Sequence, residues 1–187
     1  MRLMTTDTDV LLETDFLTFE RNSDTKHELI FNEIIEMSGA SKEHNRIVHS
    51  LAGLFYVLFS KNAEFDTFHN DMRVFDSISS SYFYPDLIVV EGTSEFLDNE
   101  FDTLINPLFI VEVLSPSTEK RDLSDKFEIY KSIPSLKEYM IVAQHKPYIK
   151  LFKKIAINHW ELFEFDKLTE MVSILDNKFQ LPLSEIY

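Results

Sequence analysis

The chain has 187 residues, of which 44% are hydrophobic and 13% aromatic, and its 32 acidic and 18 basic side chains give a formal net charge of −14. The length predicts one domain over residues 1–187, since domains hold roughly 100–200 residues, and the hydrophobic content excludes a disordered chain. Such an acidic balance excludes nucleic-acid binding through overall charge, so a nucleic-acid site would need a local basic patch or bound metal ions. Because cysteine is absent, disulfides, thiol nucleophiles and cysteine-ligated metal centres are excluded as well.

The N-terminal segment and the apolar runs argue against secretion and membrane insertion. Residues 1–12 carry Asp7 and Asp9 and lack the long apolar core of a signal peptide. The longest apolar runs, such as residues 54–59, are far shorter than the ~20 residues that cross a bilayer. We therefore expect a cytoplasmic protein without a membrane partner.

Hydrophobic patterning predicts alternating helices and strands. The first half indicates a short helix over 10–22, a hairpin of strands 27–31 and 34–37, a long helix over 41–61 with Ser41 as N-cap, strands 65–69 and 72–75, and one strand over 82–90. The second half indicates an exposed loop over 91–102, strands 108–114, 139–143, 148–154 and 160–165, a helix over 119–132, and finally an edge strand with a terminal turn. This order predicts an α/β domain with a mixed sheet and helices on its faces.

Two acidic residues lie in strands that are otherwise apolar. Glu112 interrupts residues 108–114, whose apolar character on both faces is typical of a sheet covered on both sides. A carboxylate there needs a cationic partner or a metal. Asp86 follows Pro85, which lacks a ladder donor and marks a bulge or the start of a strand. The alternatives are a Glu112 neutralised by a buried cation or placed near the strand end, and an Asx-turn at Asp86.

A lysine on the next helix completes a chemically sensible set. Asp122, Lys126 and Tyr130 follow one another at four-residue spacing and therefore share one helix face, although an ordinary surface ion pair between Asp122 and Lys126 fits the same spacing. Two strand carboxylates suit Mg²⁺ bound to a substrate phosphate, and a nearby lysine can orient water or stabilise developing negative charge. This combination predicts metal-dependent phosphodiester hydrolysis.

Several segments, in this order, resemble the Uma-two family of restriction endonucleases, a branch of the PD-(D/E)XK nuclease superfamily. They are residues 27–30, 33–37, 41–48, 85–90, 111–118, the spaced residues of the 122–130 helix, and 134–139. The stretch Glu-Val-Leu-Ser-Pro-Ser-Thr at 112–118 is the most specific of them. The resemblance covers about residues 14–166 and leaves 167–187 as a C-terminal extension.

The resemblance implies a restriction-endonuclease-like fold, with a mixed β-sheet flanked by helices, and a set of site residues. The implied metal-binding acids are Asp86 and Glu112, with Glu28 as an additional acid that residues 26–30 alone would place on a solvated strand face. The superfamily pattern has a lysine two residues after the second acid, but position 114 is leucine. The implied catalytic lysine is instead Lys126, on the helix that follows. Candidates for the pocket lining are His44, Asp122 and Tyr130.

The implied function is a Mg²⁺-dependent endonuclease that hydrolyses DNA, with Mn²⁺ as a substitute and a homodimer as the expected assembly by analogy. Two alternatives use the same residues differently: a non-catalytic binding or assembly module that keeps the nuclease fold, and a hydrolase of nucleotides or small phosphoesters. A local basic stretch, Lys146, Lys150, Lys153 and Lys154, either faces a phosphate backbone or protects a solvated strand edge.

Overall fold

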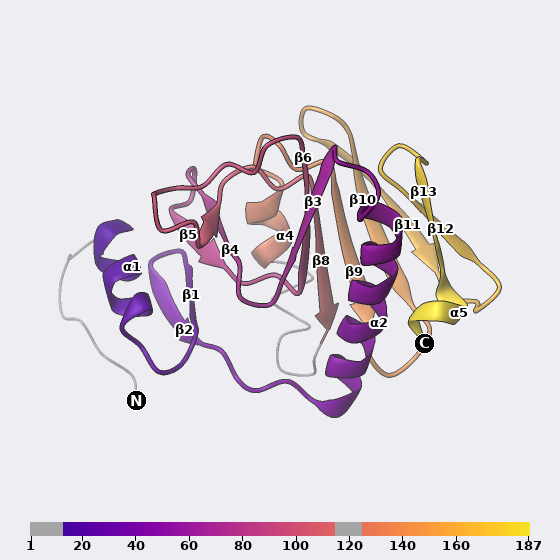
Figure 1. The fold of residues 1–187 in the computed structure, drawn as a ribbon, viewed down its shortest axis with the longest axis horizontal. Helices are drawn as coiled ribbons and strands as arrows, with labels where there is room; N and C mark the ends of the chain where they lie inside the picture. The colour runs from indigo at the N-terminus through magenta and orange to yellow at the C-terminus, as the bar shows by residue number, and fades with distance from the viewer. Residues whose placement is uncertain (1–12, 115–124) are drawn as a thin grey trace.

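The computed structural model describes residues 13–114 and 125–187, and its strands form two large sheets and a small hairpin sheet (Figure 1). The five-stranded sheet has the order β2 (Glu33–Glu36), β1 (His27–Ile30), β5 (Ser81–Phe83), β4 (Arg73–Asp76) and β7 (Thr103–Leu104). The six-stranded sheet has the order β11 (His159–Phe165), β10 (Ile149–Ala156), β9 (Glu138–Ala143), β8 (Phe109–Leu114), β6 (Leu87–Glu91) and β3 (Phe65–His69).

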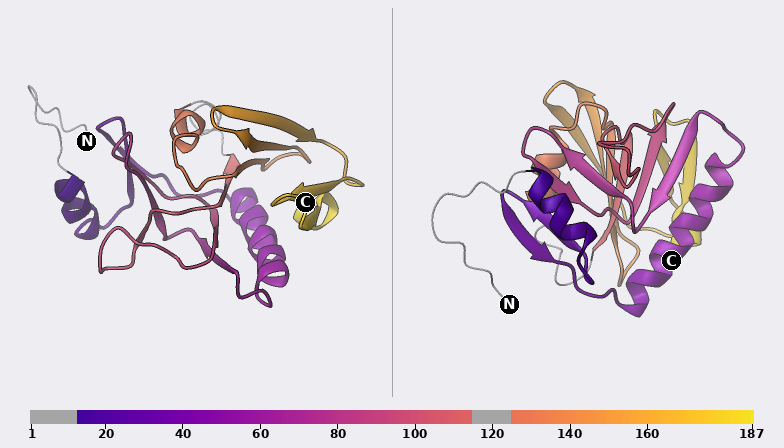
Figure 2. Two further views of the ribbon diagram at one scale, coloured as in Figure 1. Left: turned by 90° about the horizontal axis from the view of Figure 1, so that it is seen from above. Right: turned by 60° about the vertical axis from the view of Figure 1, so that its left-hand side comes forward.

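The six-stranded sheet is mixed and carries a helix on each face. β8 and β9 run parallel, whereas the other neighbouring strands of this sheet run antiparallel. The connection from β8 to β9 contains α4 (Asp125–Tyr130), because parallel neighbours need a crossover. The long helix α2 (Lys42–Phe59) packs on the opposite face, as the left panel of Figure 2 shows. The expected mixed α/β architecture is therefore confirmed.

Strand alternation divides the core into two layers and decides which way the central acid points. Val111 and Val113 of β8 join the cluster under α2, whereas Ile110 and Leu114 join the cluster that contains α4. Because successive side chains of a strand point to opposite faces, Glu112 belongs to the α4 side. The buried layer around α4 is therefore where its partners lie.

The predicted hairpin at the start of the chain is present, and α1 (Glu13–Arg21) packs beside it. Its turn consists of Phe31 and Asn32, both with positive φ (50° and 64°), the backbone conformation that lets a two-residue turn follow the twist of its strands. Phe16 and Leu17 of α1 pack against Leu29 in a third, smaller cluster. This cluster packs α1 against the five-stranded sheet.

The predicted long helix is confirmed as α2, with Ser41 as its N-cap. The Ser41 hydroxyl accepts a hydrogen bond from the His44 backbone N–H at 3.0 Å, which satisfies one of the free donors at the helix start. Ile47, Leu51 and Phe55 form its buried stripe. Among the described residues, no helix is both long and apolar enough to cross a membrane.

One predicted strand is wrong: residues 82–90 form two strands in different sheets. β5 ends at Phe83 in the five-stranded sheet, and β6 begins at Leu87 in the six-stranded sheet. Pro85 lies between them and has no backbone N–H to give to a ladder, so the chain leaves one sheet here and enters the other. Asp86 thus lies at the junction of the two sheets.

The C-terminal part also differs from the expectation of an edge strand and a terminal turn. β12 (Met171–Ile174) and β13 (Phe179–Pro182) form a separate antiparallel hairpin, followed by α5 (Leu183–Ile186). Leu175 and the next two residues all have positive φ in the turn of this hairpin. Val172, Ile174 and Leu181 join the cluster under α2, so the hairpin adds to the core.

The basic stretch lies mostly on β10, which is not a sheet edge because β9 and β11 pair with its two sides. The interpretation of these lysines as protection of a strand edge is therefore wrong. Lys150 lies 3.8 Å from Glu164, and Lys153 lies 3.4 Å from Glu138. Local ion pairs thus occupy part of this basic stretch.

Candidate functional site

Glu112 lies at the centre of a buried ion pair on the α4 side of β8. Its carboxylate is 3.1 Å from the Lys126 Nζ and accepts a hydrogen bond from the Tyr130 hydroxyl at 2.9 Å. Lys126 and Tyr130 reach the same oxygen because residues four apart on α4 share a face. Burial raises the pKa of Tyr130 well above its ordinary value, so the phenol stays protonated and remains a donor to Glu112.

Glu28 of β1 supplies a second carboxylate to the same lysine. Its Oε1 lies 2.8 Å from the Lys126 Nζ and accepts a hydrogen bond from the Tyr84 backbone N–H at 3.3 Å. All four residues of β1 are buried, so Glu28 does not lie on a solvated strand face. Lys126 therefore bridges an acid from each large sheet, and its charge offsets part of theirs.

Asp86 reaches the site from the junction between the sheets. One oxygen accepts a hydrogen bond from the Val113 backbone N–H at 2.7 Å, and the other lies 2.9 Å from His44 Nε2. Leu87 pairs with Val111 in the antiparallel β6–β8 ladder, and one further step of this register places Asp86 opposite Glu112. Opposite residues project to the same face, so the fold brings the two acids to one side of the sheet.

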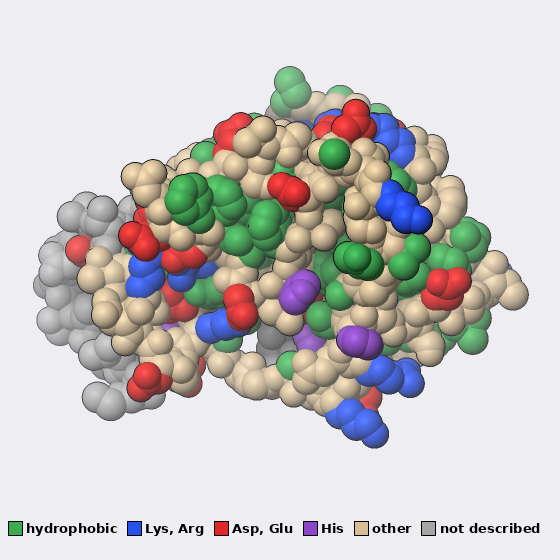
Figure 3. Space-filling view, viewed as in Figure 1, with side chains coloured by type: hydrophobic (Ala, Val, Ile, Leu, Met, Phe, Trp, Pro, Cys, Tyr) green, Lys and Arg blue, Asp and Glu red, His purple; other side chains and the backbone are tan. Residues whose placement is uncertain are grey.

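These side chains line a cavity of about 570 Å³. Five acidic residues contribute to its lining, namely Glu28, Glu36, Asp71, Asp86 and Glu112. Its cationic side chains are Lys26 and Lys126. On the face of the molecule shown in Figure 3, basic side chains are scattered among acidic ones without a continuous basic surface. The cavity is therefore polar and acidic, and the basic stretch on β10 does not border it.

The donor chemistry of the cavity fits a hard divalent cation with few protein ligands. Among the described residues, no cluster of three or more histidine or acidic side chains is arranged to hold a metal. Lys126 lies between Glu28 and Glu112, and His44 contacts Asp86. Mg²⁺ differs from cations that need a full protein cage: it keeps several waters and is bound through one or two carboxylates together with substrate phosphates. Asp86 and Glu112 are two of the carboxylates in this lining.

Comparison with known families shows which family the chain belongs to. The model of the Uma2 family, described as "Putative restriction endonuclease", matches residues 14–184. The chain belongs to the Uma2 family. The match also extends into residues 167–187, the segment that the sequence resemblance leaves outside the family region.

Relatives and a solved structure agree with this membership. The Uma2 chain is 35% identical over 157 residues to an uncharacterized protein of Synechocystis sp., covering 84% of this chain and 88% of the relative. A second uncharacterized Synechocystis protein is 29% identical over 151 residues, with 81% and 78% coverage. A crystal structure from Anabaena variabilis, described as a "putative nuclease belonging to DUF820", superposes with a TM-score of 0.76 over 93% of this chain and 96% of that one, at 14% identity. This likeness confirms the restriction-endonuclease-like fold.

The Uma2 structure brings together most of the residues that the sequence singles out. Glu28, Asp86, Glu112 and Lys126 line one cavity, and His44 lines it too. Tyr130 contacts Glu112 from behind. Asp122 lies outside the described residues.

A buried polar network behind the cavity had no sequence signal. The Tyr84 hydroxyl donates to Glu20 at 2.8 Å and accepts from Arg73 at 2.9 Å, and Glu20 also accepts from the His27 backbone N–H at 3.0 Å. This network joins α1 to β1 and β4 through Tyr84, whose backbone N–H also binds Glu28. Tyr84 precedes the Pro-Asp step and His27 begins the segment 27–30, but neither motif indicates the contacts with Glu20 and Arg73.

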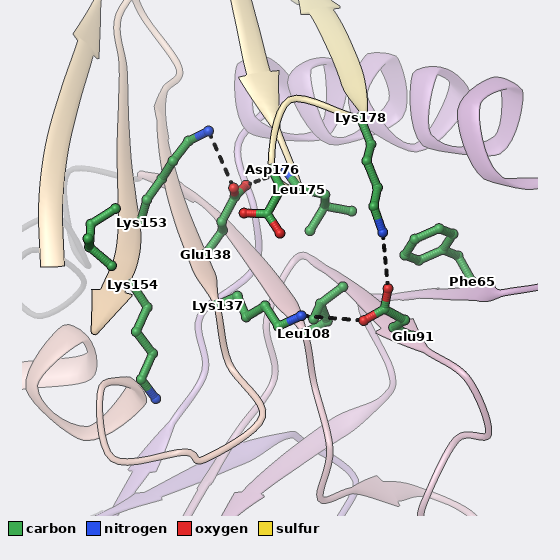
Figure 4. A pocket seen from close by; sticks show the side chains of 11 residues that line it. Phe65, Glu91, Leu108, Lys137, Glu138, Lys153, Lys154, Leu175, Asp176 and Lys178 are labelled. Atoms are coloured by element: carbon green, nitrogen blue, oxygen red, sulfur yellow. Dashed lines mark hydrogen bonds and ion pairs between the residues drawn. The ribbon is translucent and has the colours of Figure 1, made fainter. Parts of the chain in front are cut away.

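A second cavity, of about 60 Å³, lies at the opposite end of β8 and β9 (Figure 4). Lys137 and Lys178 lie 3.5 and 3.4 Å from Glu91 on its wall. Glu138 pairs with Lys153 and accepts a hydrogen bond from the Leu175 backbone N–H at 2.9 Å. Because this carboxylate ties β9 to the C-terminal hairpin, we assign the cluster a structural role.

Acidification is expected to weaken the attachment of α1 through Asp102. Two nitrogens of Arg21 bind this carboxylate at 2.7 and 2.9 Å, Arg73 pairs with it as well, and these contacts hold the pKa of Asp102 well below its usual range. Because the pKa of this carboxyl is lower in the folded than in the unfolded protein, its ionised form stabilises the fold. This contribution is present in full above the unfolded pKa of about 3.9 and is lost as the pH falls from there toward the folded pKa. Asp102→Asn should therefore lower the free energy of unfolding by about 1 kcal/mol at pH 7, and by less in acid, measured by urea denaturation.

The exposed Asp166 serves as the control, since Asp166→Asn removes a carboxylate without an arginine partner among the described contacts. An Asp102→Asn penalty of the same size at pH 7 and at pH 2 would contradict the role of the ion pairs that Asp102 forms with Arg21 and Arg73.

Proposed function

We propose that this Uma2 protein is a Mg²⁺-dependent endonuclease that hydrolyses phosphodiester bonds of DNA, with Mn²⁺ as a substitute. The observation that supports it is the convergence in one cavity of Glu112 from β8, Asp86 from the residue before β6, and Lys126 from the crossover helix. Buried charges of this kind are costly unless they are paired or used. Family membership and fold point to the same chemistry.

The charge of the site supports a divalent cation. Glu28, Asp86 and Glu112 with Lys126 leave two net negative charges when all are ionised. A divalent cation cancels that surplus, and its retained waters and a substrate phosphate would complete its coordination. We propose Asp86 and Glu112 as the main metal-binding residues, with Glu28 as the additional acid.

When bound, Mg²⁺ supplies a Lewis acid that acidifies water and offsets charge on the phosphate. Tyr130 fixes the Glu112 carboxylate through its hydrogen bond, and the Val113 N–H fixes Asp86. The Lys126 ammonium, held by its two acidic partners, is a preorganised positive charge that can orient the attacking water or stabilise a phosphoryl oxygen. His44 holds Asp86 from the cavity wall.

A competing proposal is a binding or assembly module without catalysis. The observation in its favour is that Lys126 already pairs with both Glu28 and Glu112, as in an ion network that only stabilises the junction of the sheets. The acidic lining of the cavity also opposes the approach of a DNA backbone unless cations are bound. The two proposals differ in whether the acids bind a metal.

Thermal unfolding with and without millimolar Mg²⁺ or Mn²⁺ separates them. We expect the cations to raise the Tm of the wild type, because a ligand that binds only the folded state stabilises it. Asp86→Asn should abolish the shift. Asp66→Asn, which removes an exposed acid from β3, should keep it.

Cleavage assays on duplex DNA, single-stranded DNA, RNA and a small phosphodiester then identify the substrate class. Metal-dependent cleavage of DNA supports the endonuclease proposal, whereas cleavage of the small substrate alone favours a phosphoester hydrolase. Absence of both a Tm shift and cleavage would contradict the proposed function and favour the assembly module.

A further inference from the structure

The outer side of β11 is an open sheet edge. β11 is the terminal strand of the six-stranded sheet, and within the described part of the chain only β10 pairs with it. The β10–β11 hairpin forms one margin of the molecule in the left panel of Figure 2. A free edge presents a row of backbone donors and acceptors that can pair with another chain.

This edge lacks several of the features that usually prevent pairing. Natural edges carry charged side chains, lysine above all, or proline or a bulge, or they are very short. β11 has seven residues and contains no lysine, arginine or proline, and its two charged side chains are Glu161 and Glu164. The irregularity in its pairing with β10 is confined to the end next to the hairpin turn, between Lys154 and Ala156. The rest of the strand is regular and available for pairing.

Apolar side chains project from both faces of β11. Leu162 is 46% exposed and Phe163, on the opposite face, is 40% exposed. On the α4 side, a surface groove of about 350 Å³ follows the strand and is lined by Phe127, Lys131, Phe152, Asn158, Trp160 and Leu162. Continuous apolar surface of this kind marks interaction sites in soluble proteins.

The local charge favours a second copy of the chain as the partner. The chain carries a net charge of −14, so two copies repel each other over most of their surfaces. Residues 149–165 hold three lysines and two glutamates, a nearly balanced set. Lys150 lies near Glu164, and Lys153 lies opposite Glu161 in the ladder. Repulsion between copies is therefore weak at this hairpin.

We propose that two copies of this chain pair through β11 in antiparallel register, with Leu162 on the two-fold axis. This register pairs all seven residues of the strand and joins the two six-stranded sheets into one. Leu162 then lies opposite Leu162 of the second copy, and Phe152, its neighbour on β10, extends the apolar row on each side. The interface is isologous, so it closes on two copies.

The same register avoids opposition of like charges. Glu161 lies opposite Phe163 of the second copy, and Glu164 lies opposite Trp160. Like charges directly opposite each other destabilise a ladder, whereas apolar and mixed pairs stabilise it. The assignment rests on β11 and its neighbours alone and does not depend on the proposed nuclease function.

Light scattering or sedimentation over a concentration series tests the assembly. We expect the wild type to associate reversibly to twice the 22.0 kDa of one chain. Leu162→Lys places two like charges on the axis and should raise the dimer dissociation constant at least about tenfold. Ile78→Lys alters a more exposed apolar residue in the turn before β5 and should leave the dissociation constant unchanged. Circular dichroism verifies that both variants fold.

Disulfide trapping tests the register, because the chain contains no cysteine of its own. Opposite residues of an antiparallel pair have Cα atoms about 4.5–5.5 Å apart, within the range of a disulfide. Leu162→Cys should therefore give a covalent dimer under mild oxidation, reversed by reductant. Phe163→Cys should not, because its two copies would lie diagonally, about 7–8 Å apart.

A wild type that stays monomeric throughout the concentration series would overturn the proposal. A dimer that Leu162→Lys leaves intact would place the interface elsewhere and overturn it as well. Efficient trapping through Phe163→Cys instead of Leu162→Cys would overturn the register.

Discussion

Glu112→Gln is expected to lower the rate of metal-dependent DNA cleavage by about 10²–10³-fold or more, while the protein keeps its fold. Glutamine has nearly the same size and keeps a carbonyl oxygen that can accept hydrogen bonds from Tyr130 and Lys126. It removes the negative charge that the proposed metal needs. The measurement is the initial rate of cleavage in Mg²⁺ and in Mn²⁺, with circular dichroism and Tm as checks on folding.

The neighbouring strand offers a matched control for this experiment. Glu138 of β9 is also buried and pairs with a lysine, Lys153, but it lies at the other cavity. Glu138→Gln should therefore change Tm and leave the cleavage rate close to that of the wild type. Equal loss of cleavage in both variants would mean that any buried charge substitution damages the fold. Cleavage by Glu112→Gln at the wild-type rate would remove this residue from the mechanism.

The sequence could predict the central part of the site because burial and helix spacing are local signals. An acid between apolar residues on both faces of a strand requires a partner, and Glu112 has one in Lys126. The four-residue spacing predicts that Lys126 and Tyr130 share a face, and both contact the same oxygen. The alternative of a buried cation beside Glu112 also agrees with this contact. Geometry alone therefore leaves the metal-binding role of Glu112 as a proposal.

Other parts of the site depend on contacts between distant segments. The segment 27–30 has two polar and two apolar residues, yet all four are buried, because α1 packs near one end of β1 and Lys126 reaches Glu28 from α4. No local pattern predicts these contacts. Likewise, Pro85 indicates a break within the segment 82–90. The sheet that β5 joins is set by its long-range pairing with β1, and the sheet that β6 joins by its pairing with β8.

The second large effect concerns stability: Lys126→Met is expected to lower the free energy of unfolding by about 3–5 kcal/mol at pH 7. The substitution keeps a side chain of similar length but leaves Glu28 and Glu112 as buried carboxylates without their shared cation. Chemical denaturation gives the size of the change. It is a large share of the roughly 5–15 kcal/mol that stabilises a typical domain, so Lys126→Met is a poor test of catalysis by itself.

Lys131, one residue beyond the end of α4, provides the control because it pairs with Glu128 on the surface. Lys131→Met should change the free energy of unfolding by less than about 1 kcal/mol, as exposed pairs contribute little.

Adding Glu28→Gln to Lys126→Met should recover part of the lost stability, since one of the two unpaired charges is then removed. Equal effects of Lys126→Met and Lys131→Met would contradict the buried bridge. No recovery in the double variant would show that packing around the Lys126 stem dominates over charge. Recovery would mean that the two large sheets are held together at their junction by the charges proposed to perform catalysis.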